Sequence, residues 1–592
     1  MRDAETVLGI IQQRGRQGLP LEDIYRQLFN VDLYLRAYAH LYQNQGAMTP
    51  GVSGETVDGM SLAKIEKLIG QLRSESYRWT PVKRVYIPKK NGKLRPLGIP
   101  SWSDKLLQEV IRLILEAYYE PQFNEHSHGF RPKHGCHTAL QEIAATWTGT
   151  KWFIEGDIAQ FFDTIDFEAL LQILGEKLHD NRFLRLIENL LKAGYMENLK
   201  QHQTLSGAPQ GSGVSPILSN IYLDRLDTFV EKTLIPEYNR GQKRSHYKPY
   251  SDKNARVKFL QQKGKLTEAR KLHVQVQNMP SVDPFDPNYR RLRYVRYADD
   301  VLFGFAGPKQ EAEEIKAKLA DFLKTTLKLE LSAEKTLITH APTQAARFLG
   351  YDITVMFSNS RHDHRGHRTI NGRIGLRVPA EVVEKLCRRY MRDGKPSHRN
   401  ELFRDEDFSI ITQYGAEYRG IVQYYLLAQN VGWLWKLHWV MKTSLLRTLA
   451  SKYKSTLMQM ARKYTTTIAT EHGTIQCVQV TVEREGQGKK PLVARFGGLH
   501  LRPKKQAVVL DLNPFVILSH NRTEILKRLL ADKCELCGAT EKIEVHHIRK
   551  LADLKKNGKQ QVPGWVERMS ARRRKTLMVC SKCHDEIHAG KI

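Results

Sequence analysis

Cysteine, long apolar runs and acidic side chains are all scarce in this sequence of 592 residues. Seven cysteines cannot build a disulfide framework in so long a chain, and four of them stand in two Cys-x-x-Cys pairs near the C-terminus. That pattern is typical of metal binding in a reducing compartment. Apolar runs such as 431–435 meet charged residues well before the ~20 residues that a membrane span needs. The N-terminus mixes charges and lacks the apolar core of a secretory signal, so we expect a cytoplasmic protein without membrane contact.

The shortage of acidic residues leaves a large positive charge. Lys and Arg number 93 against 63 Asp and Glu, a formal net charge of +30 at pH 7. Solubility requires far less, and a strongly basic chain most often binds phosphates, above all those of a nucleic acid. A generally basic surface without such a partner is the alternative. The hydrophobic content of 41% argues against disorder. At about 150 residues per domain, the length predicts about four domains.

Two basic segments stand out along the chain. Residues 82–87 are strand-like, residues 89–93 contain an Asn-Gly turn, and apolar residues resume at Leu94, which predicts a β-hairpin. Its Lys and Arg side chains would suit a nucleic-acid backbone or nucleotide phosphates, with plain solvation as the alternative. Residues 240–293 hold fourteen Lys and Arg against four Asp and Glu, which predicts a surface insertion that either contacts phosphates or is only solvated.

Two acidic strings indicate a catalytic metal site. Asp299 and Asp300 lie between two β-prone apolar segments in 294–305, and neighbouring carboxylates in such a setting repel unless a cation neutralises them. Asp157 ends another predicted strand. If these strands pack side by side, the three carboxylates converge. Such a cluster suits two Mg²⁺ ions about 3.5–4 Å apart, as in nucleotidyl transfer.

Tyr297–Asp300 resembles the YxDD motif of reverse transcriptases, and 157–162 resembles their first catalytic block. Further blocks follow in the order of that family: 95–100, 128–132, 207–216, 331–336 and 347–351. The resemblance implies that Asp157, Asp299 and Asp300 bind Mg²⁺. It further implies that Phe162 excludes a ribose 2′-hydroxyl, that Gln210 contacts the incoming nucleotide, that Lys335 assists the leaving pyrophosphate and that Arg95 holds the triphosphate of the dNTP. For Lys335 and Arg95, simple surface cations are the alternative.

The C-terminal cysteines and histidines form two sets. Cys534, Cys537, Cys580 and Cys583 supply four thiolates, the ligand set of a structural tetrahedral Zn²⁺. His546-His547 follows a strand-like stretch, and His584 and His588 share one face of a helix. This arrangement resembles the ββα-metal fold of HNH endonucleases. The resemblance implies that His547 is the general base and that His546, His584 and His588 hold one divalent ion. The middle asparagine of that family is absent from 571–579, and a zinc module that only binds DNA is the alternative.

Together these parts resemble the multifunctional proteins of bacterial or organellar group II introns, and 418–425 resembles their maturase domain. We therefore expect a multidomain α+β protein: a right-hand polymerase of fingers and palm, an α-helical thumb or maturase domain and a small zinc-bound ββα-metal domain. The expected divisions are 1–80 (helical extension of the fingers), 81–375 (fingers and palm), 376–470 (thumb and maturase), 471–525 (basic DNA-binding region or linker) and 526–592 (HNH endonuclease).

The resemblance implies three activities: RNA-directed DNA polymerase, splicing assistance, and nicking of double-stranded target DNA to prime reverse transcription. It implies that the protein binds intron RNA and dNTPs, persists as a ribonucleoprotein, and is bacterial, with an organellar source as the alternative. Two other functions remain open at this stage. One is an RNA-binding maturase without polymerase activity, and the other is a reverse transcriptase with a host-defence role.

Overall fold

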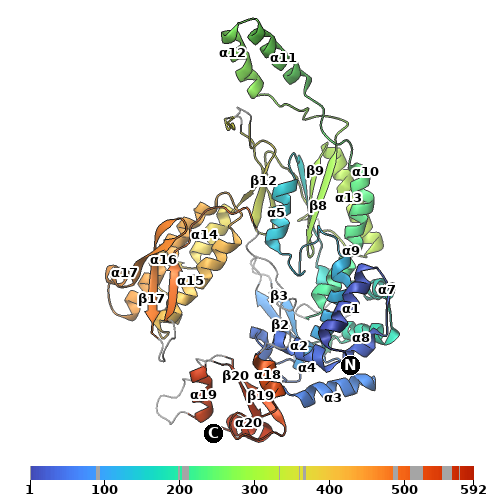
Figure 1. Ribbon diagram of the computed structural model, residues 1–592, viewed down its shortest axis with the longest axis vertical. Coiled ribbons are helices and arrows are strands. Elements are labelled where there is room, and N and C mark those ends of the chain that lie inside the picture. Colours follow the sequence, from blue (N-terminus) through green and yellow to red (C-terminus); the bar gives the residue numbers. More distant parts are fainter. Residues whose placement is uncertain are drawn as a thin grey trace.

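The structure is a computed structural model (Figure 1) that describes residues 2–88, 94–197, 200–202, 213–332, 334–358, 360–364, 368–483, 491–506, 524–549, 563–572 and 574–591. The predicted turn at 89–93 and Gln210 lie outside the described residues. The fold is of mixed α and β type. Among the described residues, no helix is long and apolar enough to cross a membrane.

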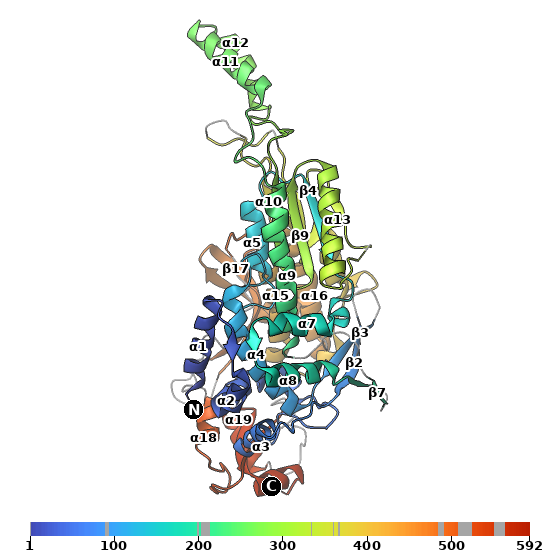
Figure 2. The same ribbon diagram turned by 90° about the vertical axis from the view of Figure 1, so that its right-hand side faces the viewer.

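A four-stranded sheet of order β10-β4-β9-β8 lies at the centre of the molecule. Its strands are β4 (Trp152–Asp157), β8 (Arg291–Tyr297), β9 (Asp300–Ala306) and β10 (Ile338–His340), and all neighbours are antiparallel. Alternate side chains of β9 belong to two different hydrophobic clusters: Val301 and Phe303 face one, and Leu302 faces the other. Helices α9 (Ser215–Phe229) and α13 (Lys309–Thr326) cover the first face, and α5 (Cys136–Thr146) covers the second. Figure 2 shows α9 and α13 over β9.

The N-terminal region is helical and leads into a second sheet, of order β3-β2-β6-β7. Strands β2 and β3 pair antiparallel, so the predicted basic hairpin is confirmed for its two strands. The elements of this region are α1 (Ala4–Arg16), α2 (Val31–Leu41), α3 (Leu62–Arg73), β2 (Val82–Pro88), β3 (Leu94–Ile99), α4 (Trp102–Tyr119), α6 (Phe161–Thr164), α7 (Phe167–Gly175), α8 (Asn181–Lys192), β6 (Tyr195–Glu197) and β7 (Lys200–His202). Short strands β1 (Leu21–Glu22) and β5 (Leu178–His179) pair parallel beside them.

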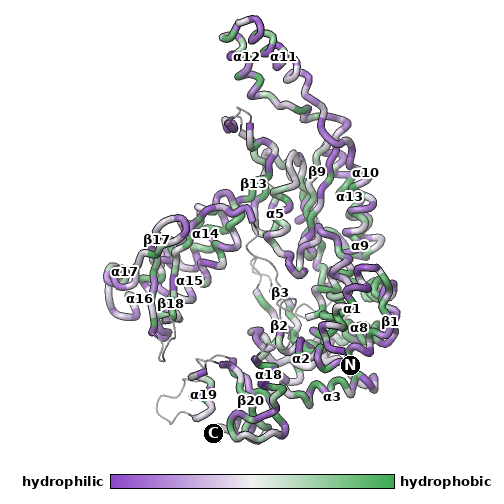
Figure 3. The backbone as a smooth tube through the Cα atoms, viewed as in Figure 1, coloured by the Kyte–Doolittle hydropathy of each residue, from purple (hydrophilic) through white to green (hydrophobic). Residues whose placement is uncertain are grey.

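The basic segment 240–293 leaves the central domain between α10 (Ile235–Tyr238) and β8. It forms a pair of helices, α11 (Lys248–Gln262) and α12 (Leu266–Gln277), that projects from one end of the molecule in both views (Figures 1 and 2). Hydrophilic residues are frequent on this pair (Figure 3), as expected for a segment whose buried side chains are few. It is therefore a surface projection.

A third sheet, β11 (Ala346–Phe348), β12 (Tyr351–Val355) and β13 (Ile374–Arg377), leads into a lateral domain. This domain contains α14 (Ala380–Arg388), the hairpin β14 (Met391–Arg392) and β15 (Lys395–Pro396), α15 (Asp407–Tyr424), α16 (Leu434–Lys452) and α17 (Leu457–Tyr464). A sheet of β16 (Thr465–Thr470), β17 (Gly473–Val482) and β18 (Leu492–Gly497) follows. A Cβ on Gly415 of α15 would lie 2.0 Å from the Arg495 carbonyl oxygen, so helix and sheet touch backbone to backbone.

That last sheet crosses the domain boundary expected at residue 470. Strands β16 and β17 pair along their length, and Val478 and Phe496 enter the same core as Tyr414 of α15. A strand with one face buried must pack that face, so 473–482 belongs with the preceding helices and not with a linker. The sequence analysis assigned 471–525 to a basic DNA-binding region or linker and missed the strand character of 473–482.

The C-terminal tail forms a small unit that packs on the N-terminal region. Hairpin β19 (Ile543–His547) and β20 (Thr576–Cys580) pairs antiparallel, and α20 (Ser581–His588) follows directly, in a ββα arrangement. Helices α18 (Glu524–Leu530) and α19 (Gly564–Arg572) lie beside the hairpin. In Figures 1 and 2 this unit lies against α2 and α3 of the N-terminal region. Its apolar residues Leu526 and Val545 continue the core that contains Tyr38 and Met60.

Candidate active sites

The three predicted palm carboxylates lie at one end of the central sheet. Asp157 is the last residue of β4 and is directly opposite Asp300, the first residue of β9, in the antiparallel register. Asp299 occupies the tight turn between β8 and β9, where Ala298 adopts a left-handed φ of 55°. The segment 128–131 packs against this turn, and a Cβ on Gly129 would lie only 2.4 Å from the Ala298 nitrogen. Only glycine permits that approach.

Burial and mutual repulsion make Asp299 and Asp300 reluctant to ionise. Burial raises the pKa of Asp300 to about 7, and the negative charges of Asp299 and Asp157 act in the same direction. Burial also raises the pKa of Asp299, again with Asp157 contributing. Lys335 Nζ lies 2.7 Å from Asp157 Oδ2 because the loop carrying it is tied to the end of β4 by the Ser332 N–H···O=C Asp157 bond of 2.8 Å. Oxygen donors that need a cation are the ligand set that Mg²⁺ prefers.

A buried ion pair that sequence analysis missed supports this turn. Arg296 of β8 and Asp227 of α9 have side chains that are 0% exposed, and Arg296 Nη2 donates to Asp227 Oδ2 over 2.6 Å. Arg296 Nη1 donates to the carbonyl oxygen of Ala298 over 3.0 Å and to Asn220 Oδ1 over 3.1 Å. The Tyr294 hydroxyl also donates to Asp227. Arg296, between Val295 and Tyr297 and directly before the acidic turn, was the available signal, since a charge buried in a strand requires a partner.

The predicted nucleotide-binding residues surround the carboxylates unevenly. Phe162, in the short helix α6 that follows β4, is half-buried with its ring 5.3 Å from that of Phe161. Arg95 of β3 is exposed, and its positive charge acts on Asp299. Lys335 is 66% exposed despite its bond to Asp157, which leaves its ammonium accessible. Cationic side chains thus border one side of the carboxylates.

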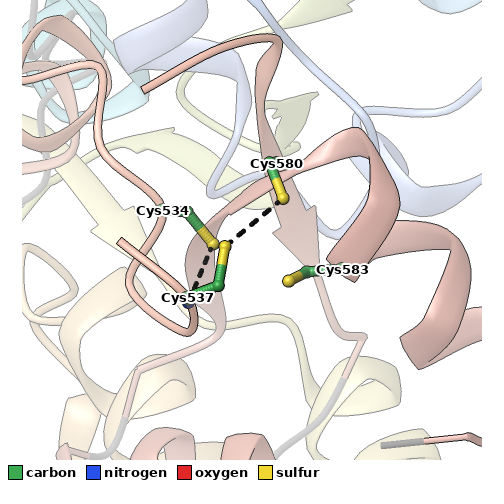
Figure 4. A group of neighbouring side chains, drawn as sticks. All are labelled: Cys534, Cys537, Cys580 and Cys583. Carbon is green, nitrogen blue, oxygen red and sulfur yellow. Dashed lines mark hydrogen bonds between the residues drawn. The ribbon is translucent and has the colours of Figure 1, made fainter. Parts of the chain in front are cut away.

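The four cysteines of the tail converge. Cys534 and Cys537 come from the loop before β19, Cys580 ends β20, and Cys583 lies in the first turn of α20, so all four sulfurs point toward one centre (Figure 4). All four Sγ atoms lie within 4.8 Å of one another, and Cys537 Sγ is 3.6 Å from Cys580 Sγ. Burial opposes ionisation of Cys534, but backbone N–H groups outweigh it and lower its pKa to about 7. Four converging sulfurs, one of them readily ionised, fit Zn²⁺.

The tail histidines form a second group, and it includes a residue from far away in the sequence. His546, His584 and His588 each offer a ring nitrogen, and Asp58 of the N-terminal region offers its carboxylate, all within 4.8 Å of one another. Asp58 Oδ2 lies 2.8 Å from His588 Nε2, and Asp58 Oδ1 lies 3.3 Å from His584 Nε2. Imidazoles with a carboxylate are a typical ligand set for a divalent ion.

His547, the predicted general base, lies beside this group but faces the other way. Its Nε2 is 2.9 Å from the Tyr38 hydroxyl, and its ring meets that of Tyr38 edge-on. The residue is 5% exposed, and burial lowers its pKa to about 3, so the imidazole is neutral at physiological pH. A neutral imidazole has the protonation state that a general base requires.

Comparison with known proteins finds a matching family for the central domain, for the lateral domain and for the C-terminal tail. A family model described as reverse transcriptase (RNA-dependent DNA polymerase) matches 87–353, one described as type II intron maturase matches 377–491, and an AI2M/AI1M-like HNH endonuclease model matches 534–584. The group II intron-encoded protein LtrA of Lactococcus lactis subsp. cremoris is 38% identical over 584 residues, which are 95% of each chain. The chain belongs to the group II intron-encoded proteins.

Other relatives differ in how much of their length this chain covers. The putative COX1/OXI3 intron 1 protein of Saccharomyces cerevisiae is 33% identical over 95% of this chain and 68% of its own. Protein YkfC of Escherichia coli is 33% identical over 52% of this chain and 77% of its own. The resemblance inferred from the sequence is therefore confirmed.

This group II intron-encoded protein carries an RNA-directed DNA polymerase domain, a maturase domain and an HNH endonuclease domain. The first two imply binding of intron RNA, and the third implies binding of DNA. Polymerase and HNH domains use divalent metal ions, and the donor sets described above fit such ions. The maturase match extends to residue 491, so it includes most of the sheet β16–β18 that sequence analysis had separated from the helices.

Proposed function

We propose that this protein uses its acidic palm site and its histidine-rich tail site for two steps of one process. The palm carboxylates Asp157, Asp299 and Asp300 serve cDNA synthesis, and the tail histidines serve the cut that creates the primer. The register that sets Asp157 opposite Asp300, with Asp299 in the adjoining turn, is the observation that carries the proposal. A protein that only bound RNA would have no physical reason to gather three repelling acids at one sheet end.

In the polymerase step, the three carboxylates hold the metal-binding position, and Arg95 and Lys335 place positive charge beside it. Two Mg²⁺ ions, when bound, would activate the primer 3′-hydroxyl and stabilise the leaving pyrophosphate. Lys335, accessible and next to Asp157, donates a proton or a hydrogen bond to the departing pyrophosphate. Phe162 blocks the space of a ribose 2′-hydroxyl and so selects dNTPs. Gln210, outside the described residues, contacts the incoming nucleotide.

In the nicking step, His547 removes a proton from the attacking water, for which its neutral imidazole is suited. His546, His584 and His588 hold one divalent ion, which would stabilise the scissile phosphate when bound. The four cysteines hold a structural Zn²⁺ that ties the loop before β19 to β20 and α20. A unit of this size buries too little apolar surface to fold without such a cross-link.

The lateral domain, 376–470 together with the sheet that follows it, serves as thumb and maturase and binds intron RNA. The remaining basic stretch before residue 526 contacts target DNA, and the net charge of +30 supplies phosphate contacts for both nucleic acids. In the proposed sequence, intron RNA enters one strand of double-stranded target DNA by reverse splicing. The tail then nicks the other strand, and the new 3′-hydroxyl primes synthesis on the intron. The protein works as a bacterial, cytoplasmic ribonucleoprotein.

Primer extension on an RNA template with dNTPs and Mg²⁺ tests the polymerase assignment. We expect synthesis by the wild type and none above background by Asp299→Ala, because a ligand of the reacting ions is lost. Asp321→Ala, which removes an exposed acid from α13, should extend primers like the wild type. Splicing of the intron RNA by Asp299→Ala should stay close to wild type.

Two results would contradict this assignment. Equal loss of splicing and synthesis in Asp299→Ala would show that the acid is structural. Absence of synthesis by well-folded wild type, assayed as a ribonucleoprotein as well, would favour a maturase without polymerase activity.

A further inference from the structure

The nuclease unit is joined to the N-terminal region through the edge of its own metal-binding hairpin. Residues 57–60, between the first helices and α3, run antiparallel to β19: the Gly59 N–H donates to the Val545 carbonyl over 3.0 Å, and the Val545 N–H donates to the Met60 carbonyl over 2.9 Å. Met60 and Val545 are both fully buried. This pairing holds the segment next to His546 and His547, although about 490 residues separate them.

Asp58 uses that position to reach every element of the histidine group. Its Oδ1 accepts the backbone N–H of His547 over 2.7 Å, and lies 3.3 Å from His584 Nε2 and 3.5 Å from His546 Nδ1. Its Oδ2 lies 2.8 Å from His588 Nε2. A single carboxylate therefore bridges the strand and the helix that carry the proposed ligands.

His546 supplies an independent observation. It is 4% exposed, and neither ring nitrogen has a hydrogen-bond partner within the part of the chain that the structure describes. Apart from the 3.5 Å contact between Nδ1 and Asp58 Oδ1, no described polar group compensates this buried imidazole for its lost hydration. A divalent ion among His546, His584, His588 and Asp58 would satisfy it.

We propose that Asp58 is the fourth protein ligand of the nuclease ion and closes the site until a DNA phosphate displaces it. This inference rests on the proposed nuclease function. Three imidazoles and one carboxylate complete a tetrahedral shell, whereas a catalytic site must keep a position for substrate. A carboxylate and a phosphate are both anionic oxygen ligands, so Asp58 holds the place that the scissile phosphate takes during nicking.

The surroundings of the general base agree with a closed site. His547 Nε2 is engaged by the Tyr38 hydroxyl, and Tyr42 also packs on its ring, so these two tyrosines cover the proposed base. Both tyrosines belong to the N-terminal region, on and just after α2. Movement of the tail unit away from 57–60 and α2 would expose His547 and, at the same time, free one position on the bound ion. The ion thus joins two regions in the DNA-free protein, and target DNA separates them.

Cobalt binding tests the ligand assignment without relying on activity. The full-length protein, with zinc retained and other metals removed, is titrated with Co²⁺, whose visible absorption reports imidazole coordination. We expect Asp58→Asn to weaken Co²⁺ binding about tenfold or more, the range seen even when only a partner of a metal ligand is removed. Asp58→Glu should keep more of the affinity, because it retains the carboxylate.

The control is Glu66→Gln, which removes an exposed acid from the neighbouring helix α3 and should bind Co²⁺ like the wild type. Hydrogen exchange gives a second readout. Co²⁺ should slow exchange of the Gly59 and Val545 amides in the wild type and fail to do so in Asp58→Asn. Equal Co²⁺ affinity and equal spectra for the wild type and Asp58→Asn would overturn the proposal. Primer extension by each variant checks that the rest of the chain is folded.

Nicking of double-stranded DNA by the ribonucleoprotein, at saturating metal, tests the closing role. Asp58→Asn should nick faster than the wild type because the phosphate no longer competes with a tethered carboxylate. Slower nicking would show that Asp58 acts within the DNA-bound site, which overturns the closing role. If neither protein nicks, the proposed nuclease function fails, while the Co²⁺ titration still decides whether Asp58 is a ligand.

Discussion

The palm site and the tail site bring their charged groups together in opposite ways. In the palm, Asp157 and Asp300 face each other across one ladder of one sheet, Asp299 lies in the adjoining turn, and Lys335 on the bordering loop remains accessible. In the tail, the histidines lie on a hairpin and a helix, and the group is completed by Asp58 from the opposite end of the sequence. The first site lies within one domain and has exposed cations beside it. The second is shared by two regions and is mostly buried, with His588 exposed at its edge.

The difference follows from the substrate that each site must admit and from how often it must admit it. A polymerase receives a new nucleotide in every cycle, so a site whose ligands come from a rigid sheet and whose border is open suits repeated turnover. A nuclease that cuts once per integration gains from a site that opens only on the proper DNA. The buried pair Arg296–Asp227 adds rigidity under the palm turn, whereas the N-terminal segment 57–60 is held to β19 by two backbone hydrogen bonds and the apolar contact of Met60 with the tail core.

The largest expected effect is confined to the C-terminal tail and leaves the polymerase intact. Cys534→Ser should unfold the tail, because a structural zinc contributes on the order of 10 kcal/mol to the folding free energy of small metal-binding units. The wild type should release one zinc per chain on denaturation, and the variant none, with nicking lost and primer extension retained. Cys136→Ser, which changes a cysteine of α5, serves as the control. A Cys534→Ser protein with a full zinc complement would refute the four-cysteine site.

A smaller change should disable the tail site without unfolding it. His547→Ala removes the proposed base and should reduce second-strand nicking to background while zinc content and primer extension stay unchanged. His273→Ala, at an exposed position on α12, should nick normally. Nicking at the wild-type rate by His547→Ala would show that another group activates the water.

The palm should be sensitive to its buried support. Asp227→Asn leaves Arg296 buried without a counter-charge and should destabilise the central domain by about 3–5 kcal/mol, measured as a lower midpoint in thermal or denaturant unfolding. The double variant with Arg296→Met removes both charges and should recover part of that loss. If the double variant is no more stable than Asp227→Asn, the pair is not what stabilises the turn.

The smallest expected effect concerns chemistry and not stability. Lys335→Met should slow single-nucleotide incorporation about 10²-fold, the lower range for loss of a proton donor, with little change in unfolding. Lys335→Arg keeps the charge and should lose less. Lys324→Met, an exposed lysine of α13, is the matched control. An unchanged incorporation rate in Lys335→Met would make Lys335 a simple surface cation.

Much of the palm site could be predicted from the sequence because its ligands are held by local pairing. A β-hairpin with Asp299 in its turn, and a strand ending at Asp157, define most of the geometry once the strands are adjacent. The cysteine site could be predicted from the sequence equally well, because two Cys-x-x-Cys pairs are typical of metal binding and of few other functions. The sheet β16–β18 was missed because 471–525 was assigned as a whole to a basic DNA-binding region or linker, although its strands bury apolar residues such as Val478 and Phe496.

Local patterns therefore predicted the chemistry: three acids for a nucleotidyl transferase, four thiolates for zinc and three imidazoles beside a base. Only the tertiary structure could reveal the roles of Asp58, Tyr38 and the pair Arg296–Asp227. Each of them contacts a residue far away in the sequence, and no local sequence pattern predicts such a contact. Asp58 carries no distinguishing motif, and its meaning comes from the burial of the tail against the N-terminal region. Hydrophobic packing brings those two regions together, and this packing is what places Asp58 beside the tail histidines.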